Sequence, residues 1–417
     1  MTSLPAGYRR TDIPQTRHAD LIRIDTWAFP TATSDETLLT FPVTLDWDRA
    51  RGVETDDGEL VAIHASYRYQ AFPVPGTRTS VSGLTWVGVH PGHRRRGLLS
   101  TMIEDHFARS LERGEAVSAL FAAEPGIYGR FGYGLAATSL RMRLPRRAPL
   151  RDVPGAAALR VRIERLDPDR HGPLMQAVHG RVDRPGWVTR ESANQLTAWT
   201  ADLEPNRGGA ESLRIAIVGD DETDATARGY ALFRRKDEWK DEGPRGIVRV
   251  REAVAQDAAT ARALWGVLLD LDLMATVEVG LLATDDPLWF LLVDPRAALP
   301  AVSDNLWVRL LDVPTALAAR RYSAPVDVVL DVTDARLPGN HGAWRVVGGP
   351  DSAGVTRSDQ PADLALDVRE LASAYLGGVS LEALASAGLV RELTPGAVRR
   401  AAVAFGWPVA PVCSWIW

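Results

Sequence analysis

An arginine-rich turn between a predicted strand and a predicted helix is the part of this 417-residue chain best suited to bind a charged ligand. The segment reads VGVHPGHRRRGLLS over residues 87–100. A helix N-terminus presents unpaired backbone N–H groups and the positive end of the helix dipole, which together favour phosphate. Arg94, Arg95 and Arg96 add charge-assisted donors. Gly97 lets the backbone approach a ligand closely, so the pattern predicts a phosphate-binding turn.

The simpler interpretation is that the three arginines form a solvated run of charge. Positive side chains at the N-terminal end of a helix oppose the helix dipole, so this placement is unfavourable unless an anion is bound. We therefore favour the phosphate interpretation.

A second, glycine-rich motif, EPGIYGRFGYG, occupies residues 124–134. Its closely spaced glycines indicate a backbone with tight turns or close packing. Tyr128 carries a phenol that can donate a proton, although aromatic residues beneath a glycine turn also serve as core. We assign Phe131 and Tyr133 to the core, and both roles stay open for Tyr128 on this pattern alone.

Strands and one helix are expected to position these two motifs. Residues 59–69, 83–89 and 116–121 are apolar, with many β-branched or aromatic side chains, and predict strands. Apolar residues at three- and four-residue spacings predict a helix over residues 97–113, with Gly114 at its C-terminal cap. This strand–helix–strand order puts both motifs in turns that follow strands.

Two further blocks follow. A basic, proline-containing stretch at residues 145–149 resembles a linker. Beyond it, a similar order of elements is predicted, with strands at 214–218, 228–235, 246–254 and 276–280 and a helix at 257–270. A third block begins near Ser303, with a strand at 326–332, a hairpin turn at 338–340 and helices at 368–376 and 395–405.

The composition is that of an ordinary globular protein. Hydrophobic residues make up 46% and charged residues 24%, and the chain is too long for one hydrophobic core. The net charge of −5 gives no support for nucleic acid or an anionic membrane as partner, and is compatible with a cationic substrate. Neither a signal peptide nor a transmembrane stretch is recognisable, so we predict a cytoplasmic protein with no membrane span.

The single cysteine limits redox and metal chemistry. Cys413 has no intrachain partner and lies near Trp415 and Trp417, so we expect it to pack rather than to act as a nucleophile. Histidine and cysteine lack the spacing of metal ligands, and we predict no metal site.

The arginine-rich turn resembles the acetyl-CoA loop of the GNAT superfamily of acetyltransferases, whose usual form is Gln/Arg-x-x-Gly-x-Gly/Ala. Arg94 and Gly97 match, whereas Leu99 stands where glycine or alanine is usual. The resemblance implies that backbone groups of the preceding strand hold the thioester and pantetheine arm, and that Tyr128 is the general acid for the departing thiolate. The implied binding set for acetyl-CoA, as cosubstrate, is Val87, Gly88, Val89, Arg94, Arg95, Arg96, Gly97, Leu98, Leu99, Ser100, Ala123 and Glu124.

HRRRGLL followed by GIYGRFGYG in one chain is similar to the Eis family of actinobacterial N-acetyltransferases, and the resemblance extends to residues 306–322 and the aromatic C-terminus. It implies an α+β fold: tandem GNAT domains, with mixed sheets flanked by helices, and a C-terminal sterol-carrier-protein-like domain. The expected domains are 1–150, catalytic and with the acetyl-CoA loop; 151–302, GNAT-like without that loop; and 303–417, sterol-carrier-like. One active site per chain and a homo-oligomer, a hexamer, are likewise implied.

The same resemblance implies an unusual general base, the α-carboxylate of Trp417. The tail PVAPVCSWIW is apolar and aromatic, so we expect it to be docked rather than frayed. A carboxylate of pKa ~3.5 is a weak base for an ammonium, so it would hold the ammonium or relay its proton through water. The alternatives are a purely structural tail and a more conventional base, Glu124.

Other charged residues are weaker candidates. His90 and His93 lie beside the turn and are expected to contact phosphate or solvent. Asp25, Asp35 and Glu36 lie in a region that, in the fold implied above, borders the acceptor channel and would attract a cation, although solvation is their simpler role.

The sequence thus predicts an N-acetyltransferase that moves acetyl from acetyl-CoA directly to a primary amine of a polycationic small molecule, such as an aminoglycoside or a polyamine. A second interpretation makes protein lysines the acceptor. A third, of a different class, is a lipid- or partner-binding module with a vestigial acetyltransferase half. The intact HRRRG turn and Tyr128 argue against the third.

Overall fold

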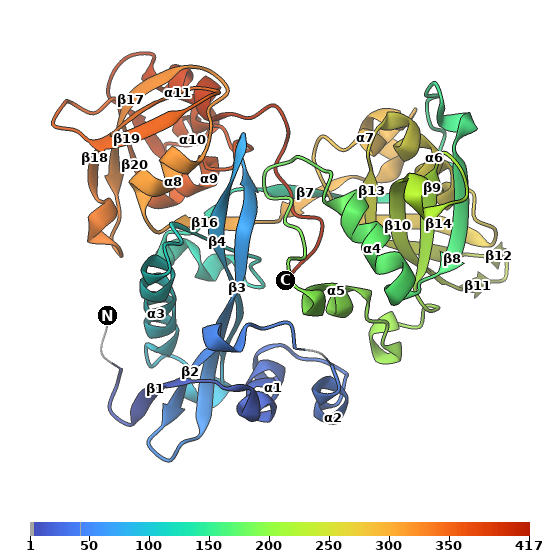
Figure 1. Ribbon diagram of the computed structural model, residues 1–417, viewed down its shortest axis with the longest axis horizontal. Helices are drawn as coiled ribbons and strands as arrows, with labels where there is room; N and C mark the ends of the chain where they lie inside the picture. The colour runs from blue at the N-terminus through green and yellow to red at the C-terminus, as the bar shows by residue number, and fades with distance from the viewer. Residues whose placement is uncertain (1–3, 42) are drawn as a thin grey trace. The chain divides into compact units, whose positions relative to one another are not determined.

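The computed structural model describes residues 4–41 and 43–417, and the chain divides into two compact units. The first unit comprises the chain up to Ala137, Asn305–Pro411 and Ile416–Trp417, and the second comprises Thr138–Asp304 and Val412–Trp415. Both units contain mixed β-sheets with helices packed against them (Figure 1). The predicted α+β class is confirmed.

The first unit contains a seven-stranded sheet in the order β1-β2-β3-β4-β5-β16-β6. The long antiparallel hairpin β3–β4 forms its centre, and β4 pairs in parallel with β5 (Figure 1). Helix α3 joins these parallel strands, as a crossover must. The elements are β1 (Tyr8–Asp12), α1 (His18–Ala28), α2 (Asp35–Leu39), β2 (Arg51–Thr55), β3 (Leu60–Val74), β4 (Thr77–Val89), α3 (Leu98–Glu112), β5 (Val117–Leu120), β6 (Gly134–Leu135) and β16 (Trp307–Leu310).

Helix α3 confirms the helix predicted for residues 97–113. Leu98, Met102, Ile103 and Phe107 are buried, because their spacing puts them on one face of the helix. The helix ends at Glu112, and Gly114 follows its C-cap with a φ of +75°, the left-handed conformation in which glycine commonly ends helices.

A buried ion pair fixes the strands around β4. Arg49 donates to both carboxylate oxygens of Glu115, each at 2.7 Å, and to the hydroxyls of Ser66 on β3 and Ser82 on β4, both at 2.9 Å. Both charged side chains are almost inaccessible to solvent. Such a pair is tolerated only where hydrogen bonds satisfy the charges, and here they tie the start of β5 to the β3–β4 hairpin.

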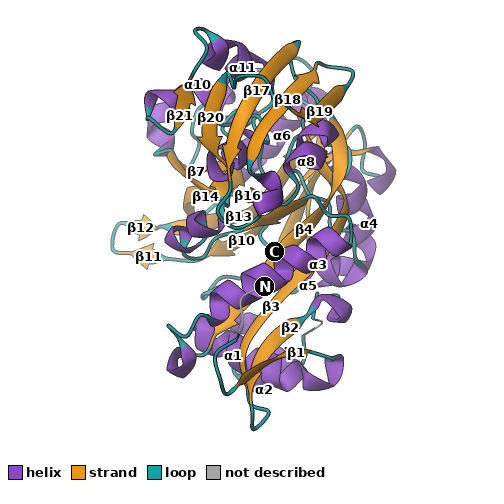
Figure 2. Cartoon of the chain, turned by 90° about the vertical axis from the view of Figure 1, so that its left-hand side faces the viewer, coloured by secondary structure: helices purple, strands orange, loops and turns teal. Residues whose placement is uncertain are grey.

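The C-terminal part of the first unit forms a sheet of its own, in the order β19-β18-β17-β20-β21 (Figure 2). The strand at 326–332, the hairpin turn at 338–340 and the helices at 368–376 and 395–405 are confirmed to within a few residues. The elements are α8 (Val313–Ala319), β17 (Val326–Thr333), β18 (Gly342–Gly348), β19 (Ala353–Arg357), β20 (Leu364–Asp367), α9 (Val368–Ala374), α10 (Leu381–Ser386), β21 (Val390–Glu392) and α11 (Ala397–Phe405).

The second unit repeats the strand–helix–strand arrangement of the first. Its sheet has the order β15-β7-β14-β13-β10-β9-β8, and the parallel strands β13 and β14 are joined by α6. The order predicted for residues 214–280 is confirmed. The elements are β7 (Thr138–Pro145), β8 (Arg160–Arg165), α4 (Pro168–His179), α5 (Ala193–Thr200), β9 (Arg214–Gly219), β10 (Ala227–Lys236), β11 (Trp239–Lys240), β12 (Gly243–Pro244), β13 (Gly246–Ala255), α6 (Ala258–Leu269), β14 (Met274–Leu282), α7 (Pro287–Leu291) and β15 (Ala301–Asp304).

Strands β7 and β16 each pair with strands that lie far from them in the sequence. β7 pairs with β14 and β15 of the second unit, whereas β16 pairs with β5 and β6 of the first. The chain therefore passes between units at residues 137–138 and 304–305, and residues 145–149 lie inside the second unit rather than linking the two. Both pairings join segments far apart in sequence, which local patterns do not report.

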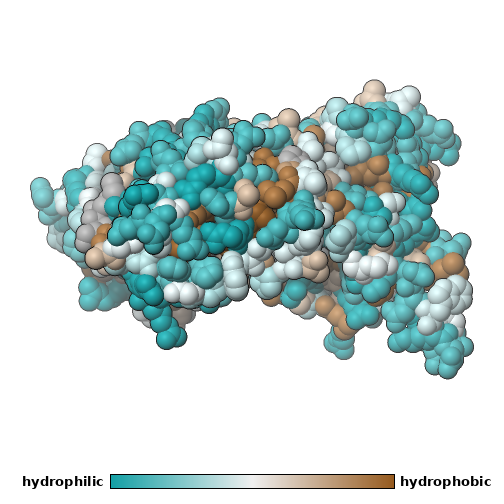
Figure 3. Space-filling model, turned by 90° about the horizontal axis from the view of Figure 1, so that it is seen from below, coloured by the Kyte–Doolittle hydropathy of each residue, from teal (hydrophilic) through white to brown (hydrophobic). Residues whose placement is uncertain are grey.

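In the described part of the chain, no helix is long and apolar enough to cross a membrane. The face shown in Figure 3 is largely hydrophilic, with small and separate hydrophobic patches. Clusters of buried apolar side chains lie under the sheets, as around Phe233 and Trp265 in the second unit.

Candidate functional site

Strands β4 and β5 separate where the candidate site begins. Their pairing runs from Val81 to Gly83 on β4, although β4 continues to Val89. Trp86 has a φ of +53°, and β4 carries one extra residue there relative to β3, which marks a β-bulge. The end of β4 therefore diverges from β5 and borders a cavity.

This cavity has a volume of about 570 Å³. The end of β4, the arginine-rich turn, the start of α3 and the glycine-rich motif all line it. Most of the residues predicted for acetyl-CoA, together with Tyr128, are among its lining: Val87, Gly88, Val89, Arg94, Arg95, Gly97, Leu98, Leu99, Ser100, Ala123, Glu124 and Tyr128. The structure thus brings the two sequence motifs together.

The start of α3 offers free backbone donors to this cavity. The helix follows Gly97, which has a φ of +79°, and among the described residues no side chain caps it. Arg95 has a φ of +61°, a conformation that costs a non-glycine residue about 1–3 kcal/mol and is found at ligand-binding turns. An uncapped helix start beside two guanidinium groups is suited to bind a pyrophosphate.

In the second unit, the N-terminus of the equivalent helix is capped by a carboxylate. Helix α6 follows β13 as α3 follows β4, but the Asp257 side chain accepts from the backbone N–H of Thr260 at 2.8 Å and from its hydroxyl at 2.9 Å. Because a negative charge already occupies the positive end of this helix, a phosphate is not favoured there. This difference gives a physical reason to expect one site per chain.

Tyr128 lines the cavity and is largely buried, with an exposed fraction of 9%. Burial, and after it the negative charge of Glu124, raises the pKa of Tyr128 to about 12. The phenol therefore keeps its proton at neutral pH, as a general acid must.

Phe131 and Tyr133 are fully buried, in agreement with their predicted core role. The Tyr133 hydroxyl lies 2.8 Å from the Ser118 hydroxyl, which in turn lies 2.8 Å from Nε2 of His106. This buried chain of polar groups holds the glycine-rich motif against β5 and α3.

Arg96, His90 and His93 shape the turn. The Arg96 guanidinium donates to the Tyr8 hydroxyl, and the same hydroxyl lies 2.9 Å from Nδ1 of His93. His93 also lines the cavity, whereas Nδ1 of His90 accepts from the backbone N–H of Gly92 at 3.2 Å. The Arg96 side chain therefore bonds to Tyr8 on β1 and is not among the residues that line the cavity.

The cavity is also lined by residues that were not among those predicted to bind acetyl-CoA. Ala28 and Phe29 come from the end of α1, Ile127 and Arg130 from the glycine-rich motif, and Arg336 from the loop after β17. Arg336 is far from the arginine-rich turn in the sequence and lies in no recognisable motif, so only the folded chain reveals its position.

Trp417 lies where β4 and β5 part. Its ring centroid is 5.0 Å from that of Tyr69 on β3 and 4.9 Å from that of Phe121, which follows β5. A Cβ at Gly83, the last residue of β4 paired with β5, would lie 3.3 Å from the indole nitrogen of Trp417. Trp417 is not among the residues that line the cavity. Its ring partner Phe121 lies two residues before Ala123, and Ala123 does line the cavity.

The preceding tail residues, Val412–Trp415, are buried, as predicted for a docked tail. Within the second unit, the Ser414 hydroxyl donates to Glu252 at 2.9 Å and the indole N–H of Trp415 donates to the Val188 carbonyl at 2.7 Å. Burial raises the pKa of the Cys413 thiol to about 12, so it stays protonated and packs.

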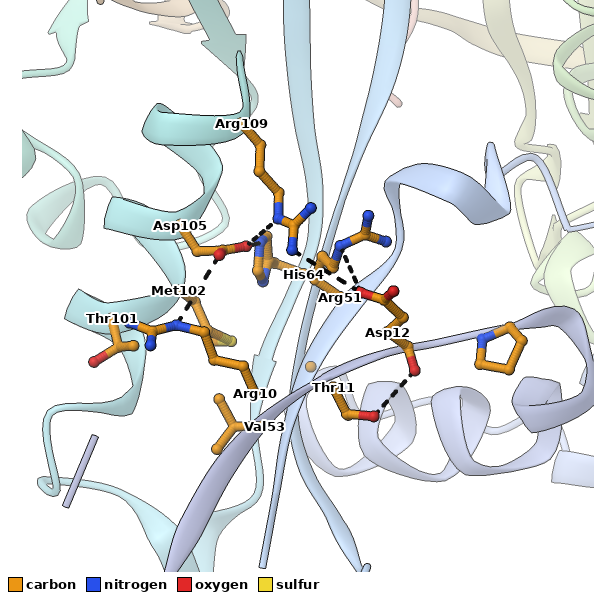
Figure 4. Close-up of a pocket in the computed structure, with 12 residues that line it drawn as sticks. Arg10, Thr11, Asp12, Arg51, Val53, His64, Thr101, Met102, Asp105 and Arg109 are labelled. Carbon is orange, nitrogen blue, oxygen red and sulfur yellow. Dashed lines mark hydrogen bonds and ion pairs between the residues drawn. The ribbon is translucent and has the colours of Figure 1, made fainter. Parts of the chain in front are cut away.

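A second cavity, also of about 570 Å³, lies among β1, β2, β3 and α3 and contains none of the predicted residues (Figure 4). Its charged side chains pair with one another. Nε of Arg109 lies 3.0 Å from Asp105, Nε of Arg51 lies 3.0 Å from Asp12, and Nε2 of His64 lies 3.6 Å from Asp105. This arrangement indicates a structural ion-pair network.

Asp105 makes this network sensitive to acid. Burial would raise its pKa, but the contact with His64 and the charge and hydrogen bond of Arg109 outweigh burial and hold the pKa at about 2. Burial also lowers the pKa of His64, so the cationic partners that remain at neutral pH are Arg109 and Arg10, whose Nε atoms lie 3.0 and 4.0 Å from the Asp105 carboxylate.

We expect Asp105→Asn to lower the free energy of unfolding by about 1–2 kcal/mol at pH 7. The folded pKa lies below the unfolded value of ~3.9, so this contribution is present above pH ~4 and is lost as the pH falls toward 2. Urea unfolding of both proteins at pH 7 and at low pH measures it. A difference that does not shrink in acid would contradict the assignment.

Within residues 4–41 and 43–417, no group of three or more histidine, cysteine or acidic side chains is placed to hold a metal ion.

Three families match successive parts of the chain. Two are described as acetyltransferase (GNAT) domains and match residues 11–136 and 186–310. The third is described as a sterol carrier protein domain and matches residues 313–414. The expected succession of domain types, two GNAT domains and one sterol-carrier domain, is confirmed.

Named relatives cover most of the chain. An uncharacterized N-acetyltransferase of Streptomyces coelicolor is 39% identical over 369 residues, 87% of this chain and 88% of the relative. The N-acetyltransferase Eis of Mycobacterium tuberculosis is 33% identical over 359 residues, 84% of each chain. The crystal structure of Eis1 from Mycobacterium abscessus superposes with a TM-score of 0.81 at 30% identity, covering 98% of this chain and 100% of that one. The chain therefore belongs to the Eis-like family of GNAT-superfamily N-acetyltransferases, enzymes that use acetyl-CoA as cosubstrate.

Proposed function

We propose that this enzyme acetylates primary amines of polycationic small molecules of the aminoglycoside or polyamine class. The observation that carries the proposal is the cavity that joins the uncapped start of α3 to the protonated phenol of Tyr128. The first feature suits a cosubstrate that carries a pyrophosphate, and the second suits the protonation of its departing thiolate. The cosubstrate would contact the backbone of Val87–Val89, the turn at Arg94–Ser100, and Ala123 and Glu124.

In the proposed reaction, the amine nitrogen forms a bond to the acetyl carbon and the carbon–sulfur bond breaks. Tyr128 gives its phenolic proton to the sulfur. The α-carboxylate of Trp417 holds the incoming ammonium and accepts one proton from it, directly or through water, so that the free amine attacks. The nitrogen loses its second proton to solvent as the amide forms, and solvent reprotonates Tyr128. Transfer is direct, because the lone thiol, Cys413, is buried and protonated.

Acidic residues on α1 and α2 support a cationic acceptor. Phe29, at the end of α1, lines the cavity, and Asp25 lies one helical turn before it. Burial raises the pKa of Asp25 to about 6, so this carboxylate is still mostly ionised at pH 7. Asp35 and Glu36 occupy the first turn of α2, which packs beside α1, and are exposed.

A competition experiment tests the acceptor class. The enzyme is incubated with acetyl-CoA and equal concentrations of an aminoglycoside, a polyamine and a peptide containing one lysine, and products are followed by mass spectrometry. We expect the two polycations to be acetylated at least about tenfold faster than the peptide, because several ammonium groups meet several carboxylates. Each acceptor incubated alone is the control.

Preferential acetylation of the peptide would overturn this proposal and favour the second candidate, a protein-lysine acetyltransferase. Assembly as a homohexamer remains a prediction from the family resemblance, and the mass of the protein in solution tests it.

A further inference from the structure

Arg336 brings the sterol-carrier domain to the cavity of the first GNAT domain. It lies in the loop between β17 and the short 3₁₀ helix Pro338–Asn340, and it lines the cavity together with the arginine-rich turn. Its Nη1 lies 3.6 Å from the Glu104 carboxylate on α3, and its guanidinium lies 5.2 Å from the centre of the Phe131 ring. The side chain remains 34% exposed, so part of the guanidinium is accessible to a ligand.

The backbone around Arg336 is held by a buried carboxylate. Oδ1 of Asp334 accepts from the backbone N–H groups of Arg336 and Leu337, at 2.9 and 3.1 Å. Oδ2 accepts from Nη2 of Arg309 on β16 at 2.6 Å and from Nδ2 of Asn340 at 2.9 Å. Arg309 and Asp334 are almost inaccessible to solvent. The loop is therefore fixed to the first sheet, and Arg336 is pre-positioned before any ligand binds.

Arg309 also contacts the glycine-rich motif. It packs beneath Gly132, where an added Cβ would lie 2.9 Å from the guanidinium carbon, and Gly132 has a φ of +83°. A side chain at Gly132 is thus excluded both by space and by conformation. The glycine-rich motif and the Arg336 loop share one buried anchor.

Among the described residues, the cavity lining consequently contains two cationic centres. The first is the turn with Arg94 and Arg95 at the start of α3. The second is formed by Arg130 and Arg336, whose guanidinium groups lie 5.0 and 5.2 Å from the centre of the Phe131 ring. Glu104, the partner of Arg336, is six residues beyond the first residue of α3, which corresponds to ~9 Å of helix rise.

Coenzyme A carries phosphate at two places, the pyrophosphate and the 3′-phosphate of its ribose. The uncapped helix start accounts for the pyrophosphate. The second cationic centre is displaced along α3 from that helix start, so a pyrophosphate bound there does not account for it. We propose that Arg336, with Arg130, binds the 3′-phosphate of coenzyme A, so that the sterol-carrier domain completes the cosubstrate site.

This inference rests on the acetyl-CoA site and not on the acceptor proposed above. It predicts that the chain distinguishes coenzyme A from 3′-dephospho-coenzyme A, and that Arg336 is responsible. A charge-assisted contact to a phosphate contributes about tenfold or more in affinity.

Calorimetric titration of the full chain with each nucleotide, without acceptor, tests this. Arg336→Gln should weaken binding of coenzyme A about tenfold and leave binding of 3′-dephospho-coenzyme A within about twofold of the unmodified chain. Arg336→Lys should retain part of the discrimination, since the charge is kept. Arg345→Gln is the matched control, because Arg345 is an exposed arginine of the same domain that pairs with Asp327 at 2.6 Å. It should bind both nucleotides as the unmodified chain does.

Equal weakening of both nucleotides by Arg336→Gln, with an unchanged melting temperature, would overturn the proposal and assign Arg336 to the pyrophosphate. Equal weakening with a lowered melting temperature would overturn it in favour of a structural role for the pair with Glu104. An unmodified chain that binds both nucleotides equally would also overturn it. None of these outcomes bears on the amine acceptor, so failure here is distinguishable from failure of the proposed function.

Discussion

Tyr128→Phe is expected to lower kcat by about 10²-fold or more while changing the affinity for acetyl-CoA by less than about twofold. The substitution removes only the phenolic oxygen, and the ring that packs against Tyr133 remains. The loss falls on kcat because the proton is needed when the carbon–sulfur bond breaks, not when the cosubstrate binds. Steady-state kinetics together with a binding titration for acetyl-CoA measure both quantities.

Tyr133→Phe is the matched control for this prediction. It removes the same oxygen from a neighbouring ring 5.8 Å away, but the Tyr133 hydroxyl bonds to Ser118 in the core and does not line the cavity. We expect it to lower stability by about 1 kcal/mol and to leave kcat within about threefold. Unchanged turnover in Tyr128→Phe would remove that residue from the role of general acid.

Displacing the C-terminal carboxylate is expected to have the second large effect. Adding two glycines after Trp417 keeps the indole ring that contacts Tyr69 and Phe121 but moves the charge away. Turnover at pH 7 should fall by about 10²-fold, the usual contribution of a positioned base. In the extended chain the rate should rise about tenfold per pH unit toward the pKa of the amine, since only the free amine then reacts. A pH–rate profile of both chains shows this.

Trp417→Phe separates the carboxylate from the ring. This variant keeps the α-carboxylate and an aromatic side chain at the point where β4 and β5 part, so its loss of turnover should stay below about tenfold. If the extended chain instead retained full turnover with an unaltered pH profile, the tail would be structural only. Glu124, which lines the cavity, would then be the remaining candidate base.

The sequence was sufficient for the local parts of the site. Helix α3, the strand before it and the glycine-rich motif were all expected, because each depends on periodicity or on glycine within one segment. Eleven of the twelve residues predicted for the cosubstrate line one cavity. Arg96 is the exception. A run of three arginines does not reveal which side chain points away from the cavity, and here the Arg96 guanidinium donates a hydrogen bond to the Tyr8 hydroxyl on β1.

The parts that depend on distant segments were not predictable. β7 and β16 each join a sheet formed largely by another part of the chain, and the pairing partners lie too far away for local patterns to indicate. The position of Arg336 was not predictable for the same reason, because it depends on the contact of Asp334 with Arg309, a residue distant in the sequence. The difference between the uncapped start of α3 and the start of α6, which Asp257 caps, could be recognised only in the folded chain. A capping side chain is identified by its hydrogen bond, and the sequence does not show that bond.

Acetyl transfer to polycationic amines can be measured as release of the thiol from acetyl-CoA, followed with an aminoglycoside, a polyamine, a lysine peptide and no acceptor. We expect rapid release with the two polycations, at more than one thiol per acceptor molecule, and little release with the peptide or without an acceptor. Silence with every amine, while a titration shows that acetyl-CoA binds, would contradict the proposed acceptor class.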